Sequence, residues 1–243
     1  LLELDKYNRL TVQTSRGCHH SCEFCASSIL LTPKYRVKPV ERVLDEIRYI
    51  KTLWKHPFIE FADDNSFVMR EHYKKLLREL IPERIRWFTE TDISVAEDEA
   101  LLELMRESGC QQILIGLESP QASGLDGLEQ RRNWKLKQLP TYEAAIKRIQ
   151  SHGITVNGCF ILGLDGHTPR IFDEVYEFVE RSGLYEVQIT VQTAFPGTPL
   201  YARLKAEERI IEDGRWDKCT LFDVNFVPTH MTPEELQQGL VDL

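Results

Sequence analysis

Short apolar runs alternate along this chain with longer stretches in which apolar residues recur every three or four positions. The short runs have the length of strands, and we predict strands at Leu10–Gln13, Phe58–Phe61, Arg86–Thr91, Gln112–Ile115, Thr155–Leu162 and Val187–Val191. The longer stretches predict amphipathic helices. Strands that alternate with helices imply parallel βα units. Six units can be counted, so we predict an α/β fold, a partial (β/α)6 TIM-like barrel.

The two ends of the chain indicate a domain of a longer protein. Thr232, Pro233 and Glu235 have the arrangement of a capping box with proline in the first turn. The apolar face of the helix that they begin continues to the last residue, Leu243, and the chain starts at Leu1 without a methionine. We therefore expect that the helix is cut at Leu243.

In parallel βα architectures, ligands bind at the C-terminal ends of the strands. This rule selects polar residues that follow the six predicted strands, together with a cysteine loop after the first strand. The residues are Asp63, Asp64 and Asn65, then Thr89, Glu90 and Thr91, then Glu118 and Ser119, then Gly163 and Asp165, and finally Gln192 and Thr193. We expect these groups on one face of the barrel.

The cysteine loop carries the most specific chemistry. Cys18, Cys22 and Cys25 have the spacing Cys-x3-Cys-x2-Cys. Three thiolates can hold three irons of a [4Fe–4S] cube, whereas a closed cluster takes four cysteines. The alternative is a Cys3His zinc site with His19 or His20. A structural zinc site usually has two separated ligand pairs, and no second cysteine pair follows, so we favour the cluster.

Several motifs together resemble one family. The run from Ser15 to Cys25 resembles the cluster loop of radical S-adenosylmethionine (SAM) enzymes. Asp63-Asp64-Asn65 stands where that family often has Gly-Gly-Glu, and it resembles the version found in the branch with a cobalamin-binding domain. The turn Pro196-Gly197-Thr198-Pro199 resembles an element of the same branch. From Tyr7 to Tyr201, the chain thus resembles the core domain of a cobalamin (B12)-binding radical SAM protein, and the predicted barrel would be of the radical SAM type.

The resemblance implies roles for individual residues. SAM would occupy the open iron of the cluster, with Phe24 near the adenine and Glu118 and Ser119 on the ribose or methionine part. The further SAM contacts would be Asp63, Asp64, Asn65, Gly163 and Gln192. The candidate catalytic residues are Glu90 and Glu118.

Each role has a plainer alternative. Asp63 to Asn65 could be a solvated turn, and Glu118 an exposed residue at a strand end. Glu90, on an otherwise apolar strand, needs a partner or a ligand, and a structural salt bridge would satisfy it. His167 is expected to be solvated. Cysteines outside the loop are expected to be small buried hydrophobic residues, namely Cys110, Cys159 and Cys219.

The implied activity is reductive cleavage of SAM to methionine and a 5′-deoxyadenosyl radical that abstracts hydrogen. Cobalamin-dependent methylation of a lipid or natural product is the first hypothesis, and rearrangement or cyclisation is the next. Residues 1–208 would form the core barrel, which includes the cluster loop at residues 15–26. Residues 209–243 would form a C-terminal extension. A cobalamin-binding domain would precede Leu1. The open alternatives are an iron–sulfur electron-transfer or sensor protein and a zinc-stapled binding module.

Composition and charge limit which partners and which compartment can be expected for this protein. The net charge of −8 argues against a nucleic-acid partner, and no apolar run is long enough to span a bilayer. Six cysteines without a disulfide-like framework suit a reducing compartment, so we expect a cytoplasmic protein. The expected partners are a small-molecule or lipid substrate and a reductant such as ferredoxin or flavodoxin.

Overall fold

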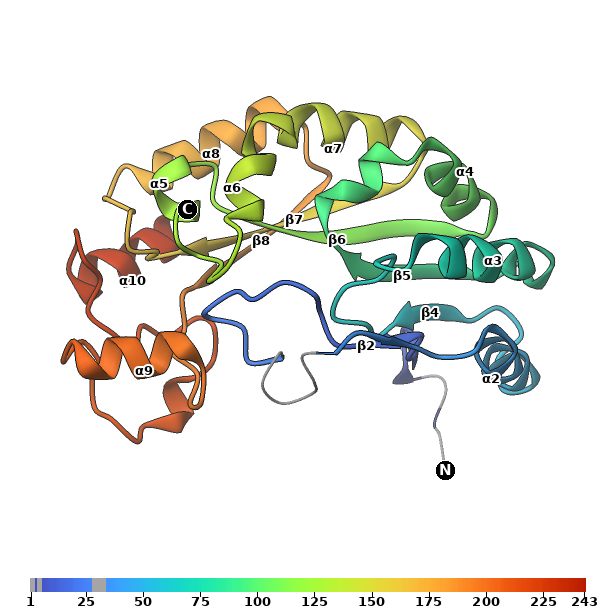
Figure 1. The fold of residues 1–243 in the computed structure, drawn as a ribbon, viewed down its shortest axis with the longest axis horizontal. Coiled ribbons are helices and arrows are strands. Elements are labelled where there is room, and N and C mark those ends of the chain that lie inside the picture. The colour runs from blue at the N-terminus through green and yellow to red at the C-terminus, as the bar shows by residue number, and fades with distance from the viewer. Residues whose placement is uncertain (1–2, 4–5, 28–33) are drawn as a thin grey trace. The chain divides into compact units, whose positions relative to one another are not determined.

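This computed structural model, which describes Glu3 and residues 6–27 and 34–243, contains a six-stranded sheet (Figure 1). Its strands lie in the order β1 (Leu10–Val12), β4 (Phe58–Phe61), β5 (Arg86–Thr91), β6 (Cys110–Glu118), β7 (Thr155–Leu162) and β8 (Glu186–Val191). The pairs β1/β4, β4/β5 and β5/β6 are parallel. This confirms the predicted α/β class with a parallel sheet of six strands.

Helices connect the strands. The α-helices are α2 (Val40–Leu53), α3 (Arg70–Leu80), α4 (Glu99–Glu107), α5 (Ala122–Leu125), α6 (Trp134–Gln138), α7 (Tyr142–Ser151), α8 (Ile171–Ser182), α9 (Pro199–Ala206) and α10 (Pro233–Asp242). Short 3₁₀-helices lie at Ile81–Glu83, Ile93–Glu97, Leu139–Thr141 and Trp216–Lys218. The two remaining strands, β2 (Ser15–Arg16) and β3 (Arg36–Val37), form a separate antiparallel pair.

The capping signal near the end of the chain is confirmed. The Thr232 side chain accepts a hydrogen bond from the Glu235 backbone N–H at 3.1 Å, and the Glu235 carboxylate accepts one from the Thr232 N–H at 2.7 Å. Both bonds satisfy backbone donors that the first turn of α10 would otherwise leave unpaired.

The chain forms two compact units. Unit 1 comprises Leu1–His19, Thr32–Ile115 and Ala144–Asn157, and unit 2 comprises His20–Leu31, Gly116–Glu143 and Gly158–Leu243. Strands β6 and β7 each begin in unit 1 and end in unit 2.

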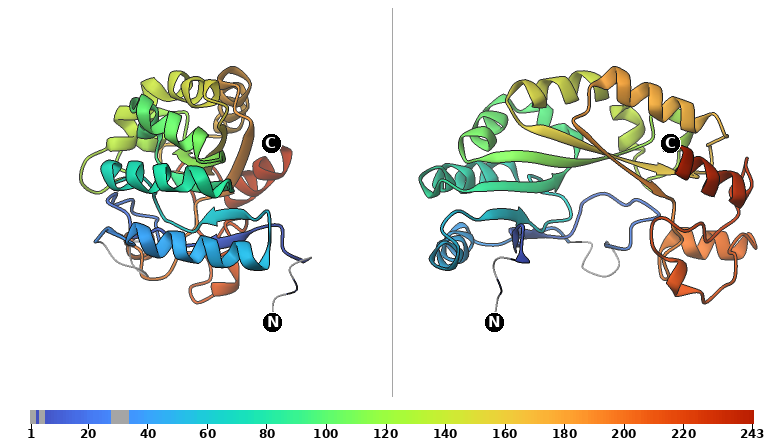
Figure 2. Two further views of the ribbon diagram at one scale, coloured as in Figure 1. Left: turned by 90° about the vertical axis from the view of Figure 1, so that its right-hand side faces the viewer. Right: turned by 180° about the vertical axis from the view of Figure 1, so that it is seen from behind.

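Within unit 1, aromatic side chains fill the space between helices and strands. Trp87 of β5 is fully buried, and its ring centroid lies 4.9 Å from that of Phe61 on β4. Tyr73 of α3 is also buried and meets Phe67 edge to face at 4.9 Å. Helices α2 and α3 lie side by side on the outside of these strands (Figure 2).

Within unit 2, helix α8 packs on strand β7 and also on helix α10. Phe178 of α8 meets Phe160 of β7 at 5.7 Å between ring centroids. A Cβ atom on Gly239 of α10 would lie 2.0 Å from the ring of Phe172, so only glycine fits there. Gly163, which follows β7 at a φ of +84°, leaves room in the same way for Leu236 of α10.

Among the described residues, we find no helix with both the length and the apolarity needed to cross a bilayer.

Candidate functional site

The carboxylate of Asp63, directly after β4, holds the start of the cysteine loop. Its Oδ1 accepts hydrogen bonds from the backbone N–H groups of Thr14 and Ser15, both at 2.7 Å. Its Oδ2 accepts from the hydroxyls of Thr14, Ser66 and Tyr73, the last two at 2.9 Å. Asp63 is buried, so these five donors offset the cost of removing its charge from water. The solvated turn suggested as an alternative is wrong for Asp63.

The next two residues contact the next part of the loop. Oδ2 of Asp64 accepts from the Gly17 backbone N–H at 3.0 Å. Nδ2 of the buried Asn65 lies 3.8 Å from Sγ of Cys18, a hydrogen bond to sulfur, and 2.9 Å from Asp92. Asp63, Asp64 and Asn65 therefore fix successive points of the loop up to the first cysteine.

Glu90 of β5 has a perturbed carboxyl group. The side chain has exposed surface, yet the protein around it is dense enough to weaken its hydration. This desolvation, together with the nearby carboxylates of Glu60, Asp64 and Asp63, raises the pKa of Glu90 to about 7. No described residue forms an ion pair with Glu90, so the salt-bridge alternative finds no support.

In unit 2, Glu118 forms a buried ion pair at the end of β6. Its Oε1 accepts a hydrogen bond at 2.8 Å from Nζ of Lys135, which also donates to the Gly116 carbonyl at 2.7 Å. Both side chains are less than a tenth exposed. The backbone of Glu118 is left-handed, with a φ of +64°, a costly conformation for a residue with a side chain. Glu118 is thus buried and paired, and the exposed strand end is wrong.

The same unit holds the middle of the cysteine loop. Cys22 pairs with Glu129 in a short antiparallel bridge, and Nδ1 of His20 lies 2.9 Å from the Glu129 carboxylate. The His20 ring packs at 4.6 Å on Trp134. Burial raises the pKa of the Cys22 thiol, whereas the positive charge of the nearby Lys135 ammonium lowers this pKa. Lys135 therefore supplies positive charge where a buried thiolate would need it.

Ser119 and His167 form a buried pair. Oγ of Ser119 lies 3.0 Å from Nε2 of His167, and it also accepts a hydrogen bond at 3.0 Å from the Gln121 N–H. Burial lowers the pKa of His167 to about 4, so the ring is neutral. The prediction of a solvated His167 is wrong, because its loop folds inward onto Ser119.

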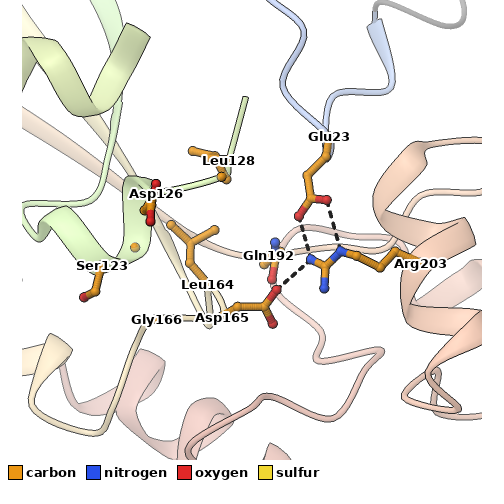
Figure 3. A pocket seen from close by; sticks show the side chains of 11 residues that line it. Glu23, Ser123, Asp126, Leu128, Leu164, Asp165, Gly166, Gln192 and Arg203 are labelled. Carbon is orange, nitrogen blue, oxygen red and sulfur yellow. Dashed lines mark hydrogen bonds and ion pairs between the residues drawn. The ribbon is translucent and has the colours of Figure 1, made fainter. Parts of the chain in front are cut away.

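A cavity of about 290 Å³ lies in unit 2 (Figure 3). It is lined by Glu23, Ser123, Gly124, Asp126, Gly127, Leu128, Leu164, Asp165, Gly166, Gln192 and Arg203. Gln192 is 2% exposed, and its Oε1 has no hydrogen-bond partner. An unpartnered buried acceptor in a cavity wall is suited to a ligand that donates a hydrogen bond.

The remaining predicted residues have less distinctive surroundings. Phe24 is half-buried. Among the other cysteines, Cys110 is buried as predicted, whereas Cys159 and Cys219 are only half-buried, so the prediction for these two is wrong. Sequence reasoning did not single out Lys135, Glu129, Glu23 or Arg203, because their partners lie on other elements.

An α/β sheet with a three-cysteine loop after its first strand is typical of enzymes that bind an iron–sulfur cluster, and a family model identifies which family this is. The model of the radical SAM superfamily matches residues 12–179. The chain therefore belongs to the radical SAM superfamily. A second model, a domain of unknown function (DUF4070), matches residues 198–243.

Two curated relatives are methyltransferases by name. An uncharacterized methyltransferase of Synechocystis sp. is 31% identical over 94% of this chain and 43% of its own length. The hopanoid C-2 methylase of Rhodopseudomonas palustris is 30% identical over 88% of this chain and 41% of its own length. The chain thus spans less than half the length of either relative.

A solved structure has the same fold. The radical SAM methyltransferase TsrM from Kitasatospora setae, with cobalamin and a [4Fe–4S] cluster bound, superposes with a TM-score of 0.73 at 15% identity. The superposition covers 98% of this chain and 48% of that one. This confirms the radical SAM type of the predicted fold.

Proposed function

We propose that this chain is the SAM-cleaving core of a cobalamin-dependent radical SAM methyltransferase. The observation that carries the proposal is the attachment of the cysteine loop. Asp63, Asp64 and Asn65 bind successive points of a loop whose three cysteines are spaced for a [4Fe–4S] cluster with one open iron. Such an attachment is more than a solvated turn requires.

The residues present fit the cluster. Cys18, Cys22 and Cys25 would be its ligands, and a fourth cysteine is missing from the loop. Asn65 already donates a hydrogen bond to Cys18 sulfur, a contact that stabilises negative charge on sulfur. His20, one of the two candidate fourth zinc ligands, faces Glu129 instead. The donor set therefore favours the cluster over a zinc site.

Several of the predicted SAM residues have side chains suited to the cofactor. In unit 1, Asp64 and Asn65 would receive the methionine ammonium, whereas the Asp63 carboxylate is occupied by its five donors. In unit 2, the free Oε1 of Gln192 can accept a hydrogen bond, and Glu118 and Ser119 are fixed by Lys135 and His167. Phe24 and Gly163 stay in the proposed SAM site, although packing of Leu236 already explains the glycine.

When bound, the cluster and SAM supply one-electron cleavage of SAM to methionine and a 5′-deoxyadenosyl radical. The residues of the chain orient SAM and exclude water from it. Glu90, with its pKa of about 7, can exchange a proton with a substrate group near neutral pH. We propose Glu90 as the acid–base residue and Glu118 as a SAM-orienting residue.

The proposal for the reaction class and the partners is based on the relatives of this chain. Both curated relatives carry methyltransferase or methylase names, and TsrM was solved with cobalamin. We accordingly propose methylation of a lipid or other natural product, with cobalamin bound by a domain outside this chain. A cytoplasmic location and a ferredoxin or flavodoxin reductant suit oxygen-sensitive cluster chemistry. The core is proposed to end near residue 208, with 209–243 as an extension.

The test is anaerobic reconstitution with iron and sulfide, reduction, addition of SAM and detection of 5′-deoxyadenosine by mass spectrometry. We expect the product with the wild-type chain and none with Cys22→Ala. Cys219→Ala removes a half-buried thiol outside the loop and should leave the product unchanged. Zinc in place of iron and sulfide would contradict the proposal.

A further inference from the structure

Arg203 connects helix α9 to the cysteine loop inside unit 2. Its guanidinium donates two hydrogen bonds to the Glu23 carboxylate, from Nη2 to Oε1 at 2.6 Å and from Nε to Oε2 at 3.1 Å (Figure 3). Glu23 lies between Cys22 and Cys25. A two-point guanidinium–carboxylate pair fixes orientation as well as distance, which a single ion pair does not.

The backbone of Glu23 is held as well. Its N–H donates to the Leu128 carbonyl at 3.0 Å, and its carbonyl accepts from the Leu200 N–H in the first turn of α9, also at 3.0 Å. One residue earlier, Cys22 pairs with Glu129. Glu23 is therefore attached on one side to the segment after α5 and on the other side to α9.

Arg203 is itself positioned by a second carboxylate. Its Nη2 lies 2.6 Å from Oδ2 of Asp165, which follows β7. Asp165 accepts further hydrogen bonds at 2.8 Å from Arg209 and from the Thr229 hydroxyl. Burial alone would raise the pKa of Asp165, but Arg209, Thr229 and Arg203 outweigh burial and lower it. Asp165 thus stays ionised and holds Arg203 toward the loop.

We propose that Arg203 is a positioning residue for the [4Fe–4S] cluster, which it stabilises by fixing Glu23 between two of the ligand cysteines. This inference rests on the proposed function, since it requires that the loop bind a cluster. It also gives the turn at Pro196–Pro199 a role, because this turn starts α9 and brings Leu200 and Arg203 to Glu23.

The test measures cluster retention. Wild-type and variant chains are reconstituted anaerobically, and the rate of iron release to a colourimetric chelator is followed together with the electron paramagnetic resonance spectrum of the reduced cluster. For Arg203→Ala we expect about tenfold faster iron release, the size of effect typical of a lost charge-assisted hydrogen bond. We also expect a broadened spectrum, because the loop would adopt several conformations.

Three further variants separate positioning from general stability. Arg203→Lys retains charge without the two-point geometry and should restore part of the wild-type rate. Glu23→Gln should release iron faster than wild type, and the double variant Glu23→Gln/Arg203→Ala no faster than Arg203→Ala, because both changes break one contact. Arg181→Ala removes an arginine that makes a single, more exposed ion pair with Glu143 at 2.6 Å, away from the loop, and should behave as wild type.

The outcomes distinguish this inference from the proposed function. If the wild-type chain binds no [4Fe–4S] cluster, both are overturned. If the wild type binds a cluster and cleaves SAM while Arg203→Ala and Glu23→Gln release iron at the wild-type rate, only the inference is overturned. Should Arg203→Ala fail to fold, Arg203→Lys and Glu23→Gln decide the question by the same two readouts.

Discussion

Asp63 accepts five hydrogen bonds with one buried carboxylate, and this explains why an acid follows β4. In Asp63→Asn the amide nitrogen could not accept the hydrogen bonds that the carboxylate now accepts, and it would itself face N–H and O–H donors. We expect a loss of about 3 kcal/mol in the free energy of unfolding, measured by urea denaturation. Asp45→Asn, at an exposed position of α2 in the same unit, should change stability by no more than about 0.5 kcal/mol. Equal effects of the two variants would contradict the structural role of Asp63.

Glu90 should make stability depend on pH. Its folded-state pKa of about 7 lies above the ordinary value of 4.5, so the folded state holds the proton more tightly than the unfolded state. Stability therefore falls as pH rises from about 4.5 through 7. In Glu90→Gln this dependence disappears, and at pH 8 the variant should be more stable than wild type by about 1 kcal/mol or less, because solvent screens an exposed group.

The measurement is urea unfolding of the apo chain at pH 4 and pH 8. At pH 4 Glu90 is mostly protonated in both the folded and the unfolded state, and the two curves should nearly coincide. A Glu90→Gln variant less stable than wild type at pH 8 would mean that the carboxylate has a stabilising partner instead.

The sequence could identify some of these residues and not others. Asp63 and Glu118 follow predicted strands, and the rule that ligands gather at strand ends is enough to select them. Lys135 is 17 positions from Glu118, and Arg203 is 180 positions from Glu23. Nothing local in a sequence marks a lysine or arginine whose carboxylate partner lies on another element.

At the scale of elements, the strand predictions succeed where an apolar run covers at least four residues. Strands β4, β5 and β7 begin and end where the apolar runs predict, at Phe58–Phe61, Arg86–Thr91 and Thr155–Leu162. The pairing of β2 with β3 and the short helices α5 and α6 were not predicted. A strand of two residues, or a helix of four or five, contains too little of its period to read, and tertiary contacts determine such elements.

The packing of α10 on α8 depends on Gly239. Alanine is a better helix former than glycine by about 1 kcal/mol, so Gly239→Ala would stabilise an isolated helix. Here its Cβ would lie 2.0 Å from the Phe172 ring, and we expect a net destabilisation of about 2 kcal/mol in thermal or urea unfolding. Adding Phe172→Leu should recover part of the loss, and Val241→Ala, 72% exposed on the same helix, serves as control. A stabilised Gly239→Ala would show that α10 can move away from Phe172.

At the scale of the whole molecule, the cysteine loop belongs to both units. Unit 1 holds its first part through Asp63, Asp64 and Asn65, and unit 2 holds Glu23 through Arg203. Each set of contacts is complete within its own unit. Cluster binding by Cys18, Cys22 and Cys25 requires the folded loop, so it should stabilise the folded chain.

Removal of the cluster should therefore lower the stability of the entire chain. A ligand bound only by the folded state adds about 3 kcal/mol at a hundredfold excess over its dissociation constant, which for a chain of this size is roughly 5–10 °C in Tm. We expect the reconstituted chain to lose about that much on chelation, with Trp87 reporting unit 1 and Trp134 and Trp216 reporting unit 2 in single-tryptophan variants. Cys22→Ala, which should hold no cluster, is expected to have about the Tm of the chelated wild-type chain both before and after chelation. If chelation leaves the Tm of the reconstituted chain unchanged, the loop holds no stabilising cluster, and the three-cysteine site proposed above is wrong.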